Sequence, residues 1–435
     1  MEFIMLGFFA AGLIACLLFG ASIVYALLFG YLIFFAYGLH CGLSVKRLCR
    51  LSLDGIYGVR MVLVVFMLIG GITAVWRASG TIPFIVYEAG HFISPEAFLP
   101  VTFLLNAGLS MLIGTSFGTA ATMGVITMTI GNSIGVNPAW SGGAVLSGIY
   151  VGDRCSPLST SALVVASITQ TDLYENLVQM ARRAVIPCLI TCIFYGCMGG
   201  MLPHEQVNLD ILDKFQAFYH LSWIVLIPAL VVIVMSIAKI AVWKTMLVSL
   251  LAASAICMTC QSMDMKSLAM AIFNGYHAPD DSLAAMMNGG GVKSMISPAL
   301  IVSISCSYSG IFEETNLLER IQREIYKLSS YLNPFGCTAV VSLGVASVAC
   351  NQTLTSIMVE KLCGSLFPNR RETALGLEDT AIVISALIPW SVASAVPLAA
   401  LGAPLWSMLF AFYLYLQPLA SGILFRKRYD RKRNQ

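Results

Sequence analysis

A polar stretch inside an apolar part of the chain most constrains the fold. Gly152-Asp-Arg-Cys-Ser-Pro-Leu-Ser-Thr-Ser161 lies between the apolar runs 139–151 and 162–168. Neither run can cross a bilayer alone, because a spanning helix needs about 20 apolar residues. We therefore predict that they are the two halves of one broken helix. Polar backbone at membrane depth is tolerated only where it is buried in protein or lines a cavity.

Composition supports a membrane location for this break. Of the 435 residues, 58% are hydrophobic and 11% are charged, whereas soluble domains carry about 25% charged residues. We predict an all-α polytopic membrane protein. Met1-Glu2-Phe3 lacks the basic region of a signal peptide, so the first helix is expected to be retained.

Basic segments set the expected topology. Further helices are expected at 3–18, 20–39, 60–76, 184–201, 221–238, 245–262, 294–311 and 403–424, with a second broken helix over 380–398 and an amphipathic segment over 313–332. The positive-inside rule places the basic C-terminal tail in the cytosol together with the basic segments predicted as loops, which are 44–50, 182–183, 239–244, 320–327 and 368–371. This works only if 97–134 and 336–363 are re-entrant hairpins. We expect ten spanning helices and two hairpins, with both termini cytoplasmic.

The order of these elements repeats. Residues 1–201 and 218–425 each hold two helices, a third helix ending in a polar break, a hairpin, a broken helix and a closing helix, and 426–435 form a basic cytosolic tail. The breaks pair in order: Gly80 with Gly310, Thr115 with Asn351, and Gly152 with Trp390. Five spans per unit give the copies opposite orientation. Two inverted five-helix repeats with broken helices are typical of secondary transporters.

Oxygen-bearing side chains gather at the breaks, and hard cations take oxygen ligands. The candidate ion- or substrate-binding residues are Thr115, Ser116, Thr119, Asp153, Ser156, Ser159, Asn351, Thr353 and Ser391. The alternative is that these hydroxyls bond back to their own helices. We expect no resident metal or cofactor; sodium and protons are expected as transported species.

A carrier that exchanges protons also needs a carboxylate that can hold one. Asp153 is the first candidate, because it is the only acid inside the first broken helix. Glu378 and Asp379 are further candidates, but they could instead cap the helix that follows them. Glu313 and Glu314 fit the solvated face of the amphipathic segment better than a coupling role.

Two arginines are candidate anion contacts. Arg77 and Arg154 could each hold a carboxylate through two parallel hydrogen bonds. The alternatives are that Arg77 anchors a helix end and that Arg154 forms a structural pair with Asp153. The chain has no Walker loop, no GxSxG and no HExxH motif, so a transporter is favoured over an enzyme.

At these residues the chain resembles the NhaC family of sodium/proton antiporters, within the ion-transporter superfamily. The similar stretches are Trp76-Arg-Ala-Ser-Gly-Thr-Ile-Pro83, Thr115-Ser-Phe-Gly-Thr119, Gly152-Asp-Arg-Cys-Ser-Pro-Leu-Ser159, Cys350-Asn-Gln-Thr353, Leu377-Glu-Asp-Thr380 and Ile388-Pro-Trp-Ser391. The resemblance implies a multi-pass carrier of the bacterial inner membrane whose coupling residues lie in these motifs. The family usually has an aspartate where this chain has Thr160.

We therefore predict sodium/proton antiport by alternating access. The alternative is sodium- or proton-coupled exchange of small carboxylates, of the malate/lactate type, or of amino acids. Thr160, in place of the usual aspartate, and Arg77 favour this alternative. The expected partners are small ions or a small organic solute, the lipid bilayer and a second copy in a homodimer, with no nucleic acid.

Overall fold

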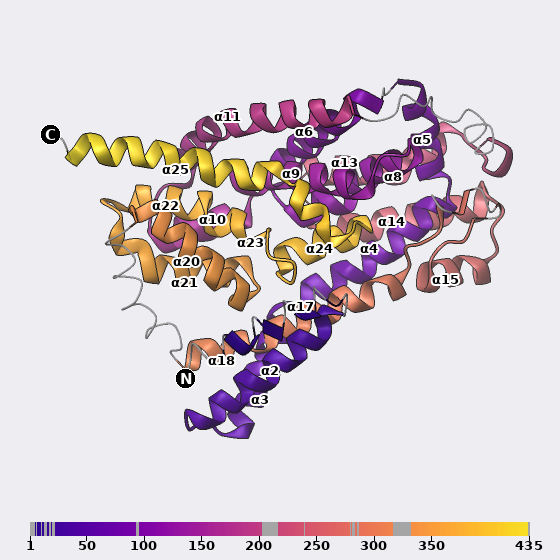
Figure 1. Cartoon of the computed structure of the whole chain (residues 1–435). Coiled ribbons are helices and arrows are strands. Elements are labelled where there is room, and N and C mark those ends of the chain that lie inside the picture. Colours follow the sequence, from indigo (N-terminus) through magenta and orange to yellow (C-terminus); the bar gives the residue numbers. More distant parts are fainter. Residues whose placement is uncertain are drawn as a thin grey trace.

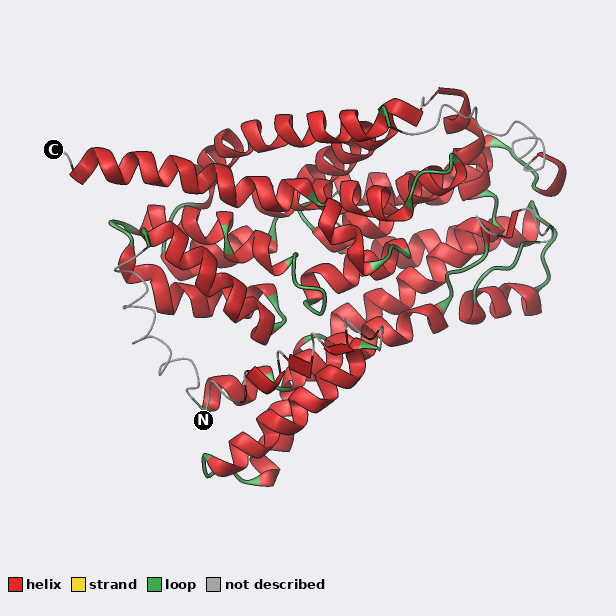
Figure 2. Cartoon of the chain, viewed as in Figure 1, coloured by secondary structure: helices red, strands yellow, loops and turns green. Residues whose placement is uncertain are grey.

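The computed structural model describes residues 22–92, 95–201, 216–238, 240–278, 287–315 and 332–433, with isolated positions between 5 and 19 and between 280 and 284. Over these residues the regular elements are helices, apart from one isolated antiparallel bridge between Tyr276 and Gly289 (Figure 2). The expected all-α fold is confirmed. Half of the predicted segment 3–18 and most of the predicted segment 313–332 lie outside the described residues.

One group of helices is arranged around α4 and α17, and its members come from residues 23–92 and 223–314. In chain order these are α2 (Ile23–His40), α3 (Val45–Gly58), α4 (Arg60–Ala78), α5 (Thr81–Phe92), η2 (Trp223–Leu226), α13 (Ile227–Ile237), α14 (Val242–Thr259), α15 (Met265–Asn274), η3 (Val292–Met295), α17 (Ile296–Ser307) and α18 (Ser309–Glu314). α4 packs against α14, α15 and η3, and α17 packs against α2 and α3.

The other elements form two hairpins, two broken helices and two long helices. They are α6 (Pro95–Ile113), α7 (Ser116–Thr119), η1 (Ala120–Gly124), α8 (Val125–Ser133), α9 (Pro138–Cys155), α10 (Thr160–Thr169), α11 (Leu173–Gly199), α20 (Pro334–Ala349), α21 (Gln352–Cys363), η4 (Gly364–Leu366), α22 (Arg370–Asp379), α23 (Ala381–Ser385), α24 (Val392–Leu401), η5 (Leu405–Phe410) and α25 (Phe412–Arg433). Figure 1 shows these elements beside the α4 group.

Membrane-spanning helices are present among the described residues. By length and composition, three helices could cross a bilayer: Arg60–Ala78, Glu96–Ile113 and Leu173–Gly199. Several apolar helices are shorter, α10 and α24 among them. Short apolar half-helices are what a broken-helix architecture requires, because each half reaches only part of the way across the bilayer.

Hairpin one consists of α6 and the returning arm α7, η1 and α8. Asn106 Nδ2 donates to Thr127 Oγ1 over 3.1 Å, and Phe98 packs against Gly131 nearer the open end. The arms are therefore antiparallel, with the tip at Gly114, whose φ of +77° lies in the left-handed region that glycine tolerates. η1 is a π-helical turn, an irregularity that is frequent at functional sites.

Hairpin two consists of α20 and α21. Cys363, at the end of α21, contacts Cys337 and Thr338 near the start of α20. The tip is Cys350, with φ +55°, followed by Asn351. Both predicted segments thus form hairpins with their polar breaks at the tips. That neither hairpin crosses the membrane stays a prediction.

Both broken helices are present, but some breaks lie elsewhere than predicted. The first break falls at residues 156–159, between α9 and α10, so Gly152 lies inside α9. The second falls at 386–391, between α23 and α24. The break assigned to Gly310 occurs at Tyr308, between α17 and α18.

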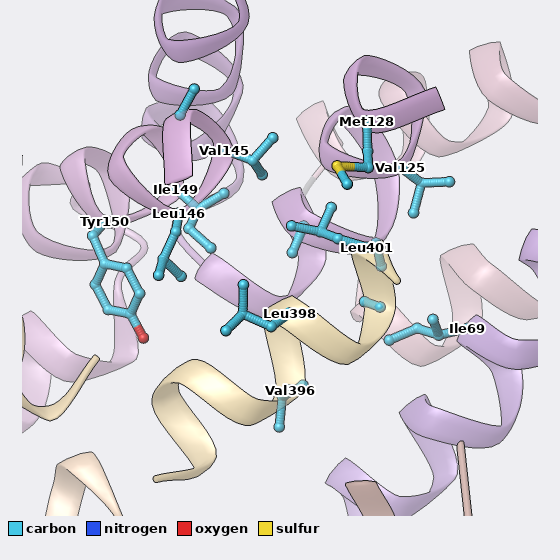
Figure 3. Close-up of a cluster of buried hydrophobic side chains, with 14 of the residues drawn as sticks. Ile69, Val125, Met128, Val145, Leu146, Ile149, Tyr150, Val396, Leu398 and Leu401 are labelled. Carbon is cyan, nitrogen blue, oxygen red and sulfur yellow. The ribbon is translucent and has the colours of Figure 1, made fainter. Parts of the chain in front are cut away.

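Each second half-helix packs on the other half of the chain. α10 contacts α21 and α22, and α24 contacts η1, α8 and α9. In Figure 3, Leu398 and Leu401 of α24 lie among Val125, Ile149 and Ile69, which come from α8, α9 and α4. The order of hairpin, broken helix and closing helix recurs as predicted. The inverted relation of the two copies stays a prediction.

Three segments predicted as loops or tails are helical. Lys46 to Arg50 lie in the first turns of α3, and the basic tail continues α25 to Arg433. α11 starts at Leu173, so the Arg182-Arg183 pair lies within a helix, not in a loop before one. A dibasic pair marks a loop only when both side chains reach solvent, and Arg183 is buried.

Glycines let α9 approach α6 closely. A Cβ on Gly152 would lie 2.1 Å from the carbonyl carbon of Ser110, and one on Gly148 would lie 2.6 Å from the Phe103 carbonyl oxygen. Small residues four apart allow membrane helices to pack backbone to backbone. This contact brings the residue after Gly152, Asp153, beside the tip of hairpin one.

We predict that Gly152→Ala separates α9 from α6. The added methyl group meets backbone atoms that cannot rotate away, so the overpacking should destabilise the fold by about 1–3 kcal/mol. Thermal unfolding in detergent measures this. Gly108→Ala on α6 is the matched control, because nothing lies within 4 Å of its Cβ position. Equal melting temperatures for the two variants would contradict the close packing.

Candidate functional site

Asp153 joins the tips of both hairpins. Its Oδ1 accepts a hydrogen bond from the Ser116 main-chain N–H over 3.3 Å, and its Oδ2 accepts one from Gln352 Nε2 over 3.3 Å. Ser116 starts the returning arm of hairpin one and Gln352 starts the returning arm of hairpin two. The side chain is buried. One carboxylate is therefore shared by both halves of the chain.

The break in the first broken helix folds back onto the same residue. Ser159 caps α10 by accepting from the Ala162 N–H over 3.1 Å, while its hydroxyl donates to the main-chain oxygen of Asp153. The Ser161 hydroxyl lies 2.9 Å from that oxygen and 3.1 Å from Oδ2. The Ser161 hydroxyl, which can donate or accept, thus contacts the carboxylate, and the Ser159 hydroxyl contacts the main-chain oxygen of the same residue.

Arg154 points away from its neighbour Asp153. Its guanidinium forms an ion pair with Asp379 at the end of α22, with both side chains fully buried. It also donates to the Tyr413 hydroxyl over 3.2 Å. The alternative in which Asp153 and Arg154 pair with each other is wrong, because the ion pair of Arg154 is with Asp379.

Asp379 is held by three donors from three elements. Besides Arg154, it accepts from Arg183 Nη1 of α11 over 3.2 Å and from Gln417 Nε2 of α25 over 3.0 Å. Asp379 and Glu378 are the last residues of α22, so the interpretation that they cap the next helix is wrong. An acid at a helix C-terminus is opposed by the helix dipole. The two guanidinium groups offset this cost for Asp379.

Glu378 has no comparable partners. The side chain is 1% exposed, and its Oε2 atom is buried without a hydrogen-bond partner. It interacts electrostatically with Arg154, Asp379 and Asp153. Glu378 is thus a buried acid beside an ion pair that is already formed.

We call Asp153, Arg154, Arg183, Glu378 and Asp379 the buried charge cluster. All five side chains are less than a tenth exposed. The cluster contains three carboxyl groups and two guanidinium groups, so in its fully ionised form it lacks one positive charge. A buried charge without compensation is costly. Because the deficit is one charge, one proton or one monovalent cation would neutralise the cluster.

Several predicted binding residues serve their own helices. Thr115, Asn351 and Ser391 cap α7, α21 and α24 by accepting main-chain N–H groups over 3.2, 2.9 and 3.3 Å. The Thr119 hydroxyl donates to the Thr115 carbonyl over 2.9 Å, and the Ser156 hydroxyl accepts from the Leu158 N–H over 3.2 Å. The alternative of bonding within the local backbone describes these contacts. Roles for these residues in ion binding stay predictions.

Two other predicted residues make no hydrogen bond or ion pair with Asp153. Thr353 is exposed, and its hydroxyl makes no hydrogen bond to a described residue. Arg77 lies in the last turn of α4, where Nη1 donates to the Thr73 carbonyl over 3.2 Å and Nε has no partner. Thr160 is exposed, whereas Ser159 and Ser161 on either side are buried against Asp153. The effect of Thr160 stays a prediction.

Two residues of the site, Arg183 and Gln417, were not predicted to belong to it. Ser161 and Gln352 were expected to supply neutral oxygens at the breaks, and both lie against Asp153. Arg183 was assigned to a loop, and Gln417 lies in an apolar helix; nothing in the sequence pairs either with Asp379. Among the described residues, no three His, Cys, Asp or Glu side chains group as a metal site.

Known proteins are similar to this chain along most of its length. The sequence model described as "Na+/H+ antiporter family" matches residues 2–199 and 148–426. The Na(+)/H(+) antiporter NhaC of Alkalihalophilus pseudofirmus is 28% identical over 89% of this chain and 86% of its own length. The malate-2H(+)/Na(+)-lactate antiporter of Bacillus subtilis is 26% identical over 81% and 78%. The arginine/ornithine antiporter ArcD of Halobacterium salinarum is 27% identical over 84% and 77%.

These matches confirm the resemblance that the motifs indicated. The two family matches together extend from residue 2 to residue 426 and include both hairpins, both broken helices and the buried charge cluster. The chain therefore belongs to the Na+/H+ antiporter family.

Proposed function

We propose that the chain exchanges sodium ions for protons by alternating access, with Asp153 as the coupling carboxylate. The observation that carries the proposal is the missing positive charge of the buried charge cluster, next to a carboxylate that both hairpin tips share. A proton or a sodium ion supplies that charge, but both together would leave an excess. Each species therefore displaces the other, and this competition couples their fluxes.

The two unpaired acids have different surroundings. Asp153 lies beside oxygen atoms that suit a hard cation: its own carbonyl and the hydroxyls of Ser159 and Ser161. Glu378 Oε2 receives no hydrogen bond, and a buried carboxylate without donors is costly to ionise. We propose that the cation binds at Asp153 and that Glu378 holds the proton when the cation is absent.

Neutralising Asp153 should abolish coupled exchange. In Asp153→Asn the cluster carries two acids and two guanidinium groups, so it needs neither proton nor cation. In proteoliposomes with an imposed pH gradient, we expect loss of sodium-driven proton movement. In the wild type, the apparent KM for sodium should rise as pH falls, by up to about tenfold per pH unit.

The matched control for this experiment is Glu175→Gln. Glu175 is an exposed acid that pairs with Arg371 over 3.4 Å, outside the cluster, so its loss should leave transport and its pH profile unchanged. An unchanged pH profile in Asp153→Asn would place the coupling acid elsewhere.

Asp379 should behave as a structural acid. Asp379→Asn leaves Arg154 and Arg183 buried without their shared counterion, a loss of about 3–5 kcal/mol for a broken buried pair. The melting temperature of Asp379→Asn in detergent should therefore fall well below that of Asp153→Asn. In Asp153→Asn, the uncharged donors around residue 153 can still donate to the amide oxygen of the new side chain. If Asp379→Asn is as stable as the wild type, the ion pairs do not hold α9, α11 and α22 together.

A second candidate function is exchange of a small carboxylate or an amino acid. It is favoured by the Arg77 guanidinium, which has a buried Nε without a partner and no ion pair with a described residue, and by the named substrates of two relatives. Wild-type vesicles should be tested with sodium, lithium, potassium, malate, lactate and amino acids in turn. Organic exchange without sodium movement, lost in Arg77→Gln, would establish this candidate and overturn sodium/proton antiport.

The cellular setting completes the proposal. We propose a multi-pass protein of the bacterial inner membrane with both termini in the cytoplasm, as a homodimer without a resident cofactor. The basic C-terminal end of α25 supports the orientation, because positive residues are retained on the cytosolic side.

A further inference from the structure

A cavity of about 410 Å³ lies where the α4 group meets hairpin two. α3 and the start of α4 form one wall through Asp54, Gly55, Gly58 and Val59, and Cys306 of α17 adjoins them. The opposite wall is the tip of hairpin two, including Asn351 and Thr353. The tip of hairpin one contributes no lining residue to it.

The wall formed by hairpin two connects this cavity to the coupling carboxylate through a single residue, Gln352. Asn351 and Thr353 line the cavity, and the residue between them, Gln352, donates to Asp153 over 3.3 Å. The Asn351 carboxamide oxygen is occupied by the main-chain N–H groups of Thr353 and Leu354. The Thr353 hydroxyl is exposed and makes no hydrogen bond to a described residue, so it is available to an occupant.

Asp54 gives the cavity its charge. The side chain is exposed and makes no ion pair or hydrogen bond with a described residue. The neighbouring cation, Arg47, is engaged by Glu314, with Nη2 and Oε2 2.8 Å apart. Among the described residues that line the cavity, Asp54 is the only charged one, and the others are glycine, apolar or uncharged polar residues.

We infer that this cavity is a cation-binding vestibule that supplies the Asp153 site, with Asp54 as the residue that attracts a hydrated monovalent cation. A charged cleft with low-dielectric walls concentrates the field of its charges, raising the local concentration of counterions. A cation bound in the vestibule reaches Asp153 faster than one from bulk solution, and the transport step itself is unchanged. This inference rests on the proposed cation transport.

Thiol modification tests the vestibule without any transport. The exposed cysteines Cys41, Cys49 and Cys197 and the cavity-lining Cys306 are replaced by serine, and Thr353→Cys is added. In detergent at low ionic strength, a trimethylammonium methanethiosulfonate should react faster than its sulfonate analogue. Asp54→Asn should lower this ratio of rates about three- to tenfold, as expected from electrostatic steering; Glu175→Gln should leave it unchanged.

Transport kinetics then test whether the vestibule lies on the ion path. Asp54→Asn should raise the apparent KM for sodium about three- to tenfold with an unchanged maximal rate, and impermeant salt should shrink the difference, since salt screens exposed charges. Three results would overturn the inference. The thiol of Thr353→Cys does not react; the ratio of the two reaction rates is the same with and without Asp54→Asn; or Asp54→Asn changes that ratio but leaves the apparent KM for sodium unchanged. Failure of sodium/proton exchange itself would appear separately, in the Asp153→Asn experiment, while the reagent ratio still reports on the cavity.

Discussion

The buried ion pair between Arg154 and Asp379 fixes the arrangement of this protein more than any other contact. It joins the last turn of α9 to the end of α22, and Arg183 of α11 completes it. A buried charge must be paired where it lies, so these three helices are held in one relative position. Because Asp153 precedes Arg154 in the same turn, the pair also leaves Asp153 facing the hairpin tips.

The glycine contact between α9 and α6 is a second constraint on the position of Asp153. Gly148 and Gly152 bring α9 against the backbone of α6, and α6 leads directly to the tip where the Ser116 N–H meets Asp153. The ion pair therefore orients Asp153, and the glycines set its distance from hairpin one. Hairpin two reaches the same carboxylate through Gln352, which also donates to the Ile382 carbonyl of α23 over 3.1 Å.

Local signals predicted the elements, and long-range pairing remained hidden. Hydrophobic runs interrupted by Gly, Pro and hydroxyl residues were enough to predict both broken helices, and the distribution of the basic loops was needed to predict the two hairpins. The interrupted runs also identified Asp153, because an ionisable residue between apolar half-helices is costly to bury and usually has a functional role. Arg183 was misassigned because a dibasic pair is usually a loop signal, and its burial depends on Asp379, 196 residues later. Cap and coupling roles of Glu378 could not be separated without knowing that α22 ends there.

The hydrogen bonds at Asp153 explain why ion occupancy would be felt by both hairpins. In the structure the carboxylate accepts hydrogen bonds from the Ser116 main-chain N–H, from the hydroxyls of Ser116 and Ser161, and from the Gln352 Nε2. A cation at the same oxygens repels these donors. The Ser161 hydroxyl can rotate and present its oxygen, and the Gln352 amide can turn to present Oε1, but the Ser116 N–H has no such freedom. Cation binding must therefore lengthen the contact to hairpin one or turn the amide at hairpin two, so the state of one carboxylate is transmitted to both tips.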